Sequence, residues 1–166
     1  MILAIDPGST ESAYVLLDES LKVIDFGKFT NENVKTEMRR SLKYYYTPER
    51  SIGVAIEMVA SYGMSVGATV FETCVWIGRF AEMSEQCGRP AQYIYRKDEK
   101  MNLCHTMRAK DSNIIQALVD RFATGQPNHG KGTRKNPGWF YGFSKDVWQA
   151  YAVGVTYHDL YIKPQQ

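Results

Sequence analysis

The sequence predicts a single α/β domain with a mixed five-stranded sheet flanked by helices. Three strand-like segments joined by short turns come first, which is the pattern of an antiparallel meander. Strand-like and helix-like segments then alternate, as they do where parallel strands carry helices on their faces. The 166 residues suit one domain, residues 1–166, because no repeat, low-complexity stretch or linker divides them.

The meander forms the N-terminal part of the chain. Strands are expected over residues 2–6 (ILAID), 13–18 (AYVLLD) and 21–29 (LKVIDFGKF). The connecting segments PGST and ES are rich in turn-forming residues. Because connections this short join antiparallel neighbours, the three strands should pair in sequence order.

The middle of the chain contains a helix and a buried strand. The helix is expected over residues 30–46, where Thr30 or Asn31 supplies the N-cap. The run SIGVAIEMV, residues 51–59, is apolar on both faces, which is typical of a strand in the interior of a sheet. A loop over residues 60–67 follows.

Periodicity and turn residues predict the remaining elements. They are a helix over residues 67–88 ended by Gly88, a strand over 91–96, a helix over 107–122, a long loop over 123–143 and a helix over 144–162 with Ser144 as N-cap. Ala150 and Gly154 lie on one face of the last helix. That face can therefore pack very closely against a sheet.

Composition excludes several classes of protein. The three cysteines, Cys74, Cys87 and Cys104, are odd in number and widely spaced, which argues against a disulfide framework and suits a reducing compartment. No apolar run approaches the roughly 18 residues of a membrane span. The N-terminus lacks the features of a secretion signal. We therefore expect a cytoplasmic protein with no membrane partner.

Charge is distributed unevenly along the chain. The whole sequence has a net charge of only +2. Residues 96–145 contain ten Lys and Arg against four Asp and Glu, whereas residues 1–95 contain nine against twelve. A basic segment beside isolated acids is compatible with a polyanion held over a metal site. A solvated basic surface would give the same composition.

Three acids occur at informative places. Asp6 ends the first strand, Glu57 interrupts the most apolar strand, and Asp146 lies in the first turn of the last helix. An ionised carboxylate on an apolar strand needs water, a countercharge or a metal ion. Taken singly, each acid has a structural explanation: a turn cap for Asp6, a salt bridge for Glu57 and a favourable helix dipole for Asp146.

Together the three acids indicate a divalent cation. Carboxylate oxygens suit Mg²⁺ or Mn²⁺, and two such ions can serve the attacking water and the leaving oxygen of a phosphodiester. A zinc site is poorly supported, because Cys104 and His105 are adjacent and no C-x-x-C or H-x₃-H spacing occurs. A cysteine nucleophile would lack an orienting third group.

Five motifs in order resemble the RuvC family of Holliday-junction resolvases, most closely its shorter phage-encoded members. They are ILAIDPGST, VAIEMVASYG, the helix over residues 67–88, RAKDSNIIQALV and KDVWQAYAVGVTY. The first motif alone also opens actin-like ATP-binding domains, but those two-lobed folds need a much longer chain. The resemblance implies an RNase H-like fold, a homodimer and Mg²⁺-dependent paired nicking of four-way DNA junctions.

The resemblance also implies roles for individual residues. Asp6, Glu57 and Asp146 match the catalytic and metal-binding acids of the family. The family usually carries a second acid three residues after the last of these, where this chain has Gln149, a neutral and weaker ligand. Asp111 or water would be candidates to fill the gap. Two ions per site are expected, Mg²⁺ or alternatively Mn²⁺, and no other cofactor.

Aromatic and basic residues are candidates for DNA binding through stacking and phosphate contact. They are Tyr62, Arg108, Lys110, Lys131, Arg134, Lys135 and Trp139. Tyr62 lies about where the family carries a base-stacking aromatic, and Arg108 and Lys110 match its basic helix start. Packing of the rings onto the domain and solvated surface charge are the alternatives.

The helix over residues 67–88 matches the family's dimer helix. Its small residues Gly67, Cys74 and Gly78 would let a partner helix approach. Ordinary core packing is the alternative for this helix.

The sequence therefore favours a crossover junction endodeoxyribonuclease that resolves branched DNA by paired nicks. Its partners would be branched DNA and a second copy of the chain, in the host cytoplasm if the gene is phage-encoded. Two alternatives stay open. One is a nuclease with relaxed choice among forks and flaps, and the other is a protein that binds branched DNA without cutting, which Gln149 favours.

Overall fold

A five-stranded mixed sheet forms the centre of the molecule. The structure is a computed structural model that describes residues 1–45, 51–61, 63 and 65–163. The strands are β1 (Ile2–Asp6), β2 (Glu11–Leu17), β3 (Val23–Thr30), β4 (Gly53–Met58) and β5 (Ala91–Tyr95). Their order is β3-β2-β1-β4-β5. The first three strands pair antiparallel, whereas β4 runs parallel to β1 and β5, which confirms the predicted mixed sheet.

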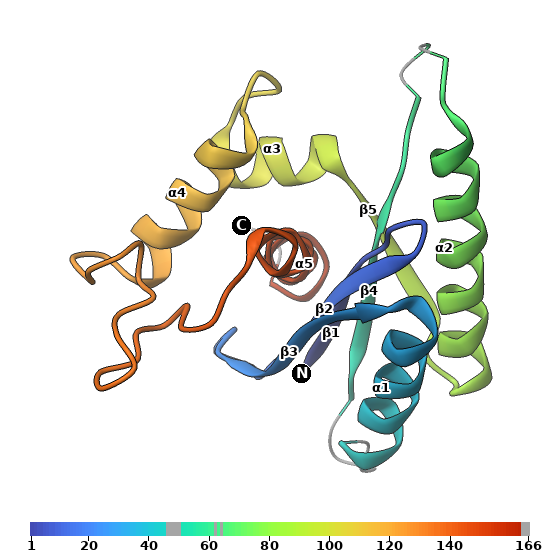
Figure 1. Ribbon diagram of the computed structural model, residues 1–166, viewed down its shortest axis with the longest axis horizontal. Helices are drawn as coiled ribbons and strands as arrows, with labels where there is room; N and C mark the ends of the chain where they lie inside the picture. The colour runs from blue at the N-terminus through green and yellow to red at the C-terminus, as the bar shows by residue number, and fades with distance from the viewer. Residues whose placement is uncertain (46–50, 62, 64, 164–166) are drawn as a thin grey trace.

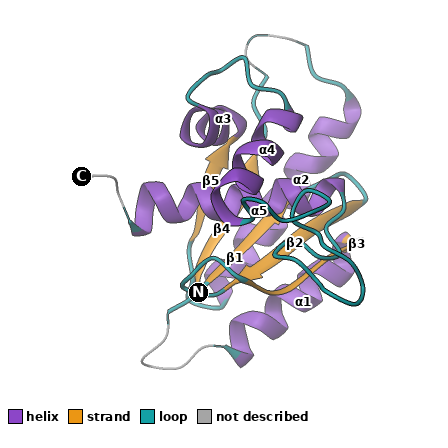
Figure 2. Ribbon diagram, turned by 90° about the vertical axis from the view of Figure 1, so that its left-hand side faces the viewer, coloured by secondary structure: helices purple, strands orange, loops and turns teal. Residues whose placement is uncertain are grey.

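Helices cover both faces of this sheet (Figures 1 and 2). They are α1 (Asn31–Tyr44), α2 (Ala68–Gln86), α3 (Arg96–Cys104), α4 (Asp111–Phe122), α5 (Lys145–Tyr157) and the π-helical turn η1 (His158–Ile162). Figure 1 shows α1 and α2 on one side of the sheet and α5 on the other. α3 and α4 pack against each other and against α5.

Strand β1 is buried on both faces. Ile2 and Ala4 belong to the core beneath α5, while Leu3 and Ile5 belong to the core beneath α1 and α2. Successive side chains of a strand point to opposite faces, so an apolar run without polar alternation is what a central strand requires. Asp6 is the first charged residue after this run and lies at the strand's carboxyl end.

Close packing places α5 directly on the sheet. A Cβ atom at Gly154 would lie 2.8 Å from Leu17 Cδ1 and 3.2 Å from Ala4 Cβ, so a larger residue would push the helix outward. The predicted close-packing face is thereby confirmed. Because α5 lies on β1 and β2, its first turn, with Asp146, comes to the end of β1 that carries Asp6.

The structure corrects the prediction after β5. A helix, α3, starts at Arg96, the last residue of the predicted strand, and continues through a segment where no regular element was expected. The first five residues of its sequence, RKDEKMNLC, are all charged and it has no apolar stripe, so periodicity gave no signal. The helix start is stabilised by the Tyr95 N–H, which donates a hydrogen bond to Asp98 Oδ2 at 3.1 Å.

Two helix boundaries and two predicted caps also differ from the prediction. α4 begins at Asp111 rather than at residue 107, because Lys110 is extended and its N–H donates to Asn113 Oδ1 at 2.8 Å. The last helix changes to a π-helical turn at His158. Thr30 and Ser144 occupy the N-cap positions of α1 and α5, but their side chains make no capping hydrogen bond.

The loop over residues 123–143 is irregular, as predicted, but well packed. Its only strand-like feature among the described residues is an isolated bridge between Gly132 and Pro137. Phe140 is fully buried, with its ring centroid 4.4 Å from that of Trp148 and 5.3 Å from that of Tyr151. No helix in the described part of the chain is long and apolar enough to cross a membrane.

Candidate active site

The carboxyl ends of β1 and β4 bring two of the predicted acids side by side. The two strands are parallel neighbours with Ile5 opposite Ile56, so Asp6 and Glu57 come next along each strand. The two carboxyl groups form a hydrogen bond with each other. Such a bond needs a proton between the two acids, so one of them is protonated when it forms.

Burial and repulsion shift the pKa values of this pair. Burial raises the pKa of Asp6 well above its usual range, and the negative charges of Glu57 and Asp146 add to the effect, while Arg96 opposes it. Burial also raises the pKa of Glu57, although the hydrogen bond from Asp6 and the positive charge of Arg96 act against it. The pair therefore keeps a proton at pH values where isolated carboxylates are ionised.

Asp146 reaches the same place from α5. Its Oδ2 lies 2.8 Å from Lys28 Nζ on β3, and that nitrogen is also 3.2 Å from Glu11 Oε2. The Lys28 side chain is 41% exposed, so its ion pairs are partly solvated and readily exchanged. Asp6, Lys28 and Asp146 line one hollow together with the turn after β1. The structure thus brings the three predicted acids together.

Two buried polar side chains fix the turn that follows Asp6. Ser12 Oγ accepts a hydrogen bond from the Gly8 N–H at 3.1 Å and contacts Asn31 Oδ1 at 2.5 Å. Asn31 Nδ2 donates to the Gly8 carbonyl at 3.0 Å. A Cβ at Gly8 would overlap the Glu11 carbonyl oxygen, so glycine is required there. The predicted PGST turn therefore holds the wall of the hollow in one shape.

A fourth acid, Glu99, lies beside the pair and was not predicted. Its side chain is fully buried in the first half of α3. Burial raises its pKa well above the usual range, the charges of Glu57 and Asp6 add to the effect, and Arg96 opposes it. The sequence signal that could have found Glu99 is weak, because an acid within a charged segment predicts exposure.

Arg96 is a countercharge that acts on Asp6, Glu57 and Glu99. Its Nη1 lies 2.5 Å from Glu99 Oε2, and its Nη2 lies 2.5 Å from Asp111 Oδ1. The Asp111 side chain is 52% exposed and is engaged by this ion pair. Asp111, one of the residues expected to complete the site, is therefore tied to Arg96 at the start of α4.

Gln149 lies one helical turn after Asp146 and is 91% buried. Its amide oxygen has no hydrogen-bond partner among the described residues. The same is true of Glu99 Oε1. Buried polar atoms are almost always paired. Ser41 Oγ and Thr156 Oγ1 are the other buried side-chain oxygens without a partner among the described residues, and only Glu99 and Gln149 lie on the neighbouring elements α3 and α5 close in sequence to Arg96 and Asp146.

The donor set fits a hard divalent ion. Asp6, Glu57 and Asp146 offer only oxygen ligands, and the unpaired oxygens of Glu99 and Gln149 are of the same kind. Such sets suit Mg²⁺ and Mn²⁺. Among the residues that the structure describes, no three Asp, Glu, His or Cys side chains are already grouped as metal ligands. Instead, Asp6 and Glu57 are engaged by each other. Asp146 is paired with Lys28, and Glu99 is paired with Arg96.

The candidate DNA-binding residues divide into exposed and packed groups. Arg108, Lys110, Arg134 and Lys135 are exposed, Lys131 is half-buried, and Tyr62 lies outside the described residues. The Trp139 ring stacks on Phe122 at 5.6 Å, and its Nε1–H donates to the Tyr151 hydroxyl at 3.1 Å. Trp139 thus packs the loop onto the domain, which is the alternative that the sequence left open.

One face of α2 has no partner within the described residues. Thr73, Ile77 and Phe80 are buried against the sheet, whereas Phe71 is 62% and Val75 is 55% exposed. Cys74 and Gly78 are exposed on the same outer side. A single chain thus leaves a row of apolar and small residues in contact with water.

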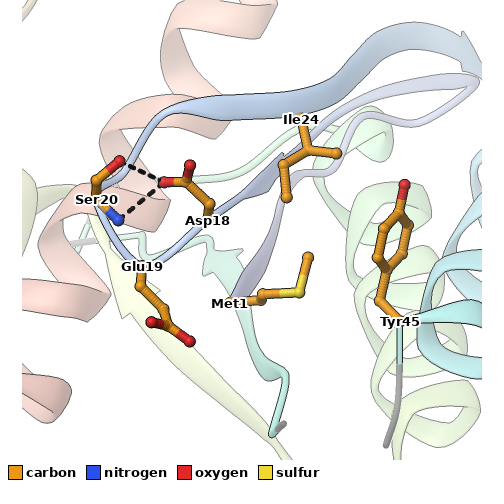
Figure 3. Close-up of a pocket in the computed structure, with 6 residues that line it drawn as sticks. All are labelled: Met1, Asp18, Glu19, Ser20, Ile24 and Tyr45. Carbon is orange, nitrogen blue, oxygen red and sulfur yellow. Dashed lines mark hydrogen bonds between the residues drawn. The ribbon is translucent and has the colours of Figure 1, made fainter.

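A second hollow lies at the opposite end of β1 (Figure 3). Met1, Ile24 and Tyr45 form its apolar part, and Asp18 is its central acid. Asp18 Oδ1 accepts hydrogen bonds from the Ser20 N–H at 2.8 Å, the Ser20 hydroxyl at 2.7 Å and the Lys22 N–H at 2.9 Å. One oxygen of this acid is therefore engaged by its own turn.

The fold is shared with solved structures, although the sequence has diverged. No family model and no curated protein matches the sequence. The structure of RuvC from T. thermophilus in complex with a Holliday junction substrate has a TM-score of 0.67 and 14% identity, covering 98% of this chain and 94% of that chain. A further Thermus thermophilus RuvC structure has a TM-score of 0.60 and 15% identity, covering 94% and 92%. The chain has a RuvC-like, RNase H-like fold.

Proposed function

We propose that this protein is a metal-dependent endonuclease that resolves Holliday junctions and related branched DNA by paired nicks. The observation that carries the proposal is the convergence of Asp6, Glu57 and Asp146 at one end of the sheet. The similar fold of a RuvC solved with a Holliday junction substrate supports the choice of DNA as substrate.

Asp6, Glu57 and Asp146 would hold the divalent ions, Mg²⁺ or Mn²⁺, with two ions in each site. Bound ions of this kind activate a water molecule and neutralise the charge that develops on a phosphodiester. The carboxyl–carboxyl hydrogen bond between Asp6 and Glu57 must then lose its proton, because a ligand oxygen has to be free. Lys28 must likewise release Asp146, and its ammonium group remains near the hollow to face a phosphate.

The protein's own charges prepare the site for a polyanion. Arg96 reduces the repulsion among Asp6, Glu57 and Glu99, so these acids can lie near one another without a metal ion. Exposed Arg108 and Lys110 at the start of α4, with the basic residues of the 123–143 loop, would attract the phosphate backbone. The rigid turn at Gly8 keeps the backbone beside Asp6 in place while DNA binds.

A homodimer is the second part of the proposal. The outer face of α2 exposes Phe71 and Val75, and the small residues Cys74 and Gly78 beside them would let another helix approach closely. Burial of this apolar row favours association with a second copy. A two-fold axis would direct two active sites at two strands of a four-way junction.

A protein that binds branched DNA without cutting it is the competing function. The specific observation in its favour is Gln149, because a neutral amide replaces the acid that the resemblance leads us to expect. A nuclease with relaxed choice among forks and flaps is a neighbouring possibility within the proposed class.

A cleavage assay distinguishes these functions. Labelled four-way, forked and linear duplex DNA would be incubated with the protein in Mg²⁺, in Mn²⁺ and in EDTA. We expect symmetric nicks in the four-way junction that require the metal and are absent from the linear duplex. Binding without nicking in either metal would support the competing function, and equal cleavage of forks and junctions would support relaxed specificity.

A further inference from the structure

One acid beside the candidate active site is buried but incompletely paired. Glu99 is fully buried, and its Oε2 lies 2.5 Å from Arg96 Nη1. Its other oxygen, Oε1, has no partner among the described residues. A buried carboxylate that served only to anchor Arg96 would be expected to have both oxygens hydrogen-bonded, because an unpaired charged oxygen is costly away from water.

The position of Glu99 relates it to the other acids. α3 starts directly after β5, and β5 lies beside β4 with Ile94 opposite Glu57. The charges of Glu57 and Asp6 both act on the Glu99 carboxyl group. Glu99 is therefore part of the same cluster, although it comes from an element that carries none of the other acids.

Gln149 supplies the complementary observation. It is 91% buried, its Oε1 is also unpaired, and its amide cannot contribute a negative charge. α5 therefore lacks a charge at Gln149, where an acid was expected, and α3 carries an acid, Glu99, that was not expected.

We propose that Glu99 is the fourth carboxylate ligand of the metal site and supplies the charge that Gln149 lacks. This inference rests on the proposed function for the identity of the site. Arg96 holds Glu99 through one oxygen, and Oε1 would be the atom that binds the ion. Gln149 contributes at most a neutral oxygen from α5.

The test is Mn²⁺ binding by the purified full chain without DNA, measured by titration calorimetry and by electron paramagnetic resonance of free Mn²⁺. Glu99→Gln keeps the shape and an acceptor for Arg96 but removes the charge. We expect it to weaken Mn²⁺ binding about 10- to 100-fold. The control Glu85→Gln removes an exposed acid from α2 and should bind Mn²⁺ as the wild type does.

A compensating variant separates a ligand from a structural anchor. Glu99→Gln combined with Gln149→Asp moves the charge from α3 to α5 and should regain most of the lost Mn²⁺ affinity. An anchor for Arg96 would not be replaced from α5. Circular dichroism and thermal unfolding check that each variant folds, and Glu99→Asp, which retracts the carboxylate, replaces Glu99→Gln if the latter does not fold.

Two outcomes would overturn the assignment of Glu99. They are Mn²⁺ binding unchanged in both Glu99 variants while Asp6→Asn abolishes it, and no measurable Mn²⁺ binding by the wild type. Junction cleavage is read separately. A wild type that binds Mn²⁺ through Glu99 but nicks no branched DNA refutes the proposed function and leaves the Glu99 ligand standing.

Discussion

Two buried acids of this protein, Asp159 and Glu99, differ in how completely their oxygens are paired. Asp159, in η1, is 8% exposed and receives hydrogen bonds from Arg121 Nη1 at 2.6 Å, Arg121 Nη2 at 2.9 Å and Asn102 Nδ2 at 2.9 Å. His158 Nδ1 lies 3.1 Å from the same carboxylate. Glu99 has a single ion pair, with Arg96, and one unpaired oxygen.

The pKa directions follow from these partners. Burial acts to raise the pKa of Asp159, but the hydrogen bonds from Arg121, Asn102 and His158 lower it below its usual range. Burial and the neighbouring acids raise the pKa of Glu99, and Arg96 does not compensate. An acid that stabilises the fold is thus saturated with donors. An acid that keeps free oxygens beside other acids destabilises the metal-free protein and is suited to bind a cation.

The largest expected difference between the two regions concerns nicking. Asp6→Asn should reduce junction nicking about 10²- to 10³-fold or more, the scale on which loss of one group that stabilises transition-state charge acts. Junction binding measured by gel shift should persist. Asp159→Asn should nick at the wild-type rate per folded molecule. Full nicking by Asp6→Asn in Mg²⁺ would refute the assignment of the active site.

The next largest effect is on the free energy of unfolding, and here the substitution at Asp159 is the one that matters. Asp159→Ala should lower the free energy of unfolding by about 1.5–3 kcal/mol, because it removes charged hydrogen bonds and leaves Arg121 without its partner. Urea unfolding at neutral pH measures the change. The exposed acid Asp120 provides a matched control, since Asp120→Ala should change stability by less than about 1 kcal/mol.

A smaller effect concerns pH. Asp6, Glu57 and Glu99 have raised pKa values, so the native state binds more protons than the unfolded chain above about pH 4. Stability in EDTA should therefore fall as pH rises from about 5 to 8. Asp6→Asn should unfold about 2–4 °C above the wild type at pH 8, the shift that roughly 1 kcal/mol produces at this size.

The contribution of Asp159 to stability changes with pH in the opposite direction. Its lowered pKa adds stability above the unfolded value and loses it on acidification. Thermal unfolding of Asp6→Asn and Asp159→Asn across pH therefore separates the two regions. A wild type whose stability in EDTA rises steadily toward pH 8 would contradict the account of the acid cluster.

The smallest effect concerns Lys28, whose pair with Asp146 is partly solvated. Lys28→Met should leave the free energy of unfolding almost unchanged, because exposed ion pairs contribute little to stability. It should also lower the Mn²⁺ concentration needed for half-saturation, because Asp146 no longer has a competing cation. Weaker Mn²⁺ binding in this variant would show that Lys28 orders the site instead of competing for it.

Much of the fold could be predicted from local patterns. The apolar run over Ile2–Asp6 indicated a strand, the run around Glu57 indicated a strand in the interior of the sheet, and Gly88 marked the end of the long helix correctly. The helix over residues 96–104 was missed because its one fully buried side chain is Glu99, a residue type whose burial has no periodic signal.

Three acids of the candidate site were predicted because each stood out against its own segment. Asp6 and Glu57 interrupt apolar strands, and Asp146 begins a helix with small residues on its packing face. Asp111 was considered for the gap left by Gln149, whereas the structure pairs it with Arg96. Trp139, considered for DNA stacking, packs on Phe122, and no local feature of the sequence distinguished the two uses.

The sequence by itself determined the strand and helix pattern, the uneven charge and the three acids that face unfavourable surroundings, because these depend on residue type and local spacing. Only the tertiary structure decided that Glu99 joins those acids, that Arg96 divides its guanidinium between Glu99 and Asp111, and that Asp159 is fully paired. Those outcomes depend on which distant side chains share a low-dielectric interior, and burial and partners there, not the residue type alone, set the charge state of an acid.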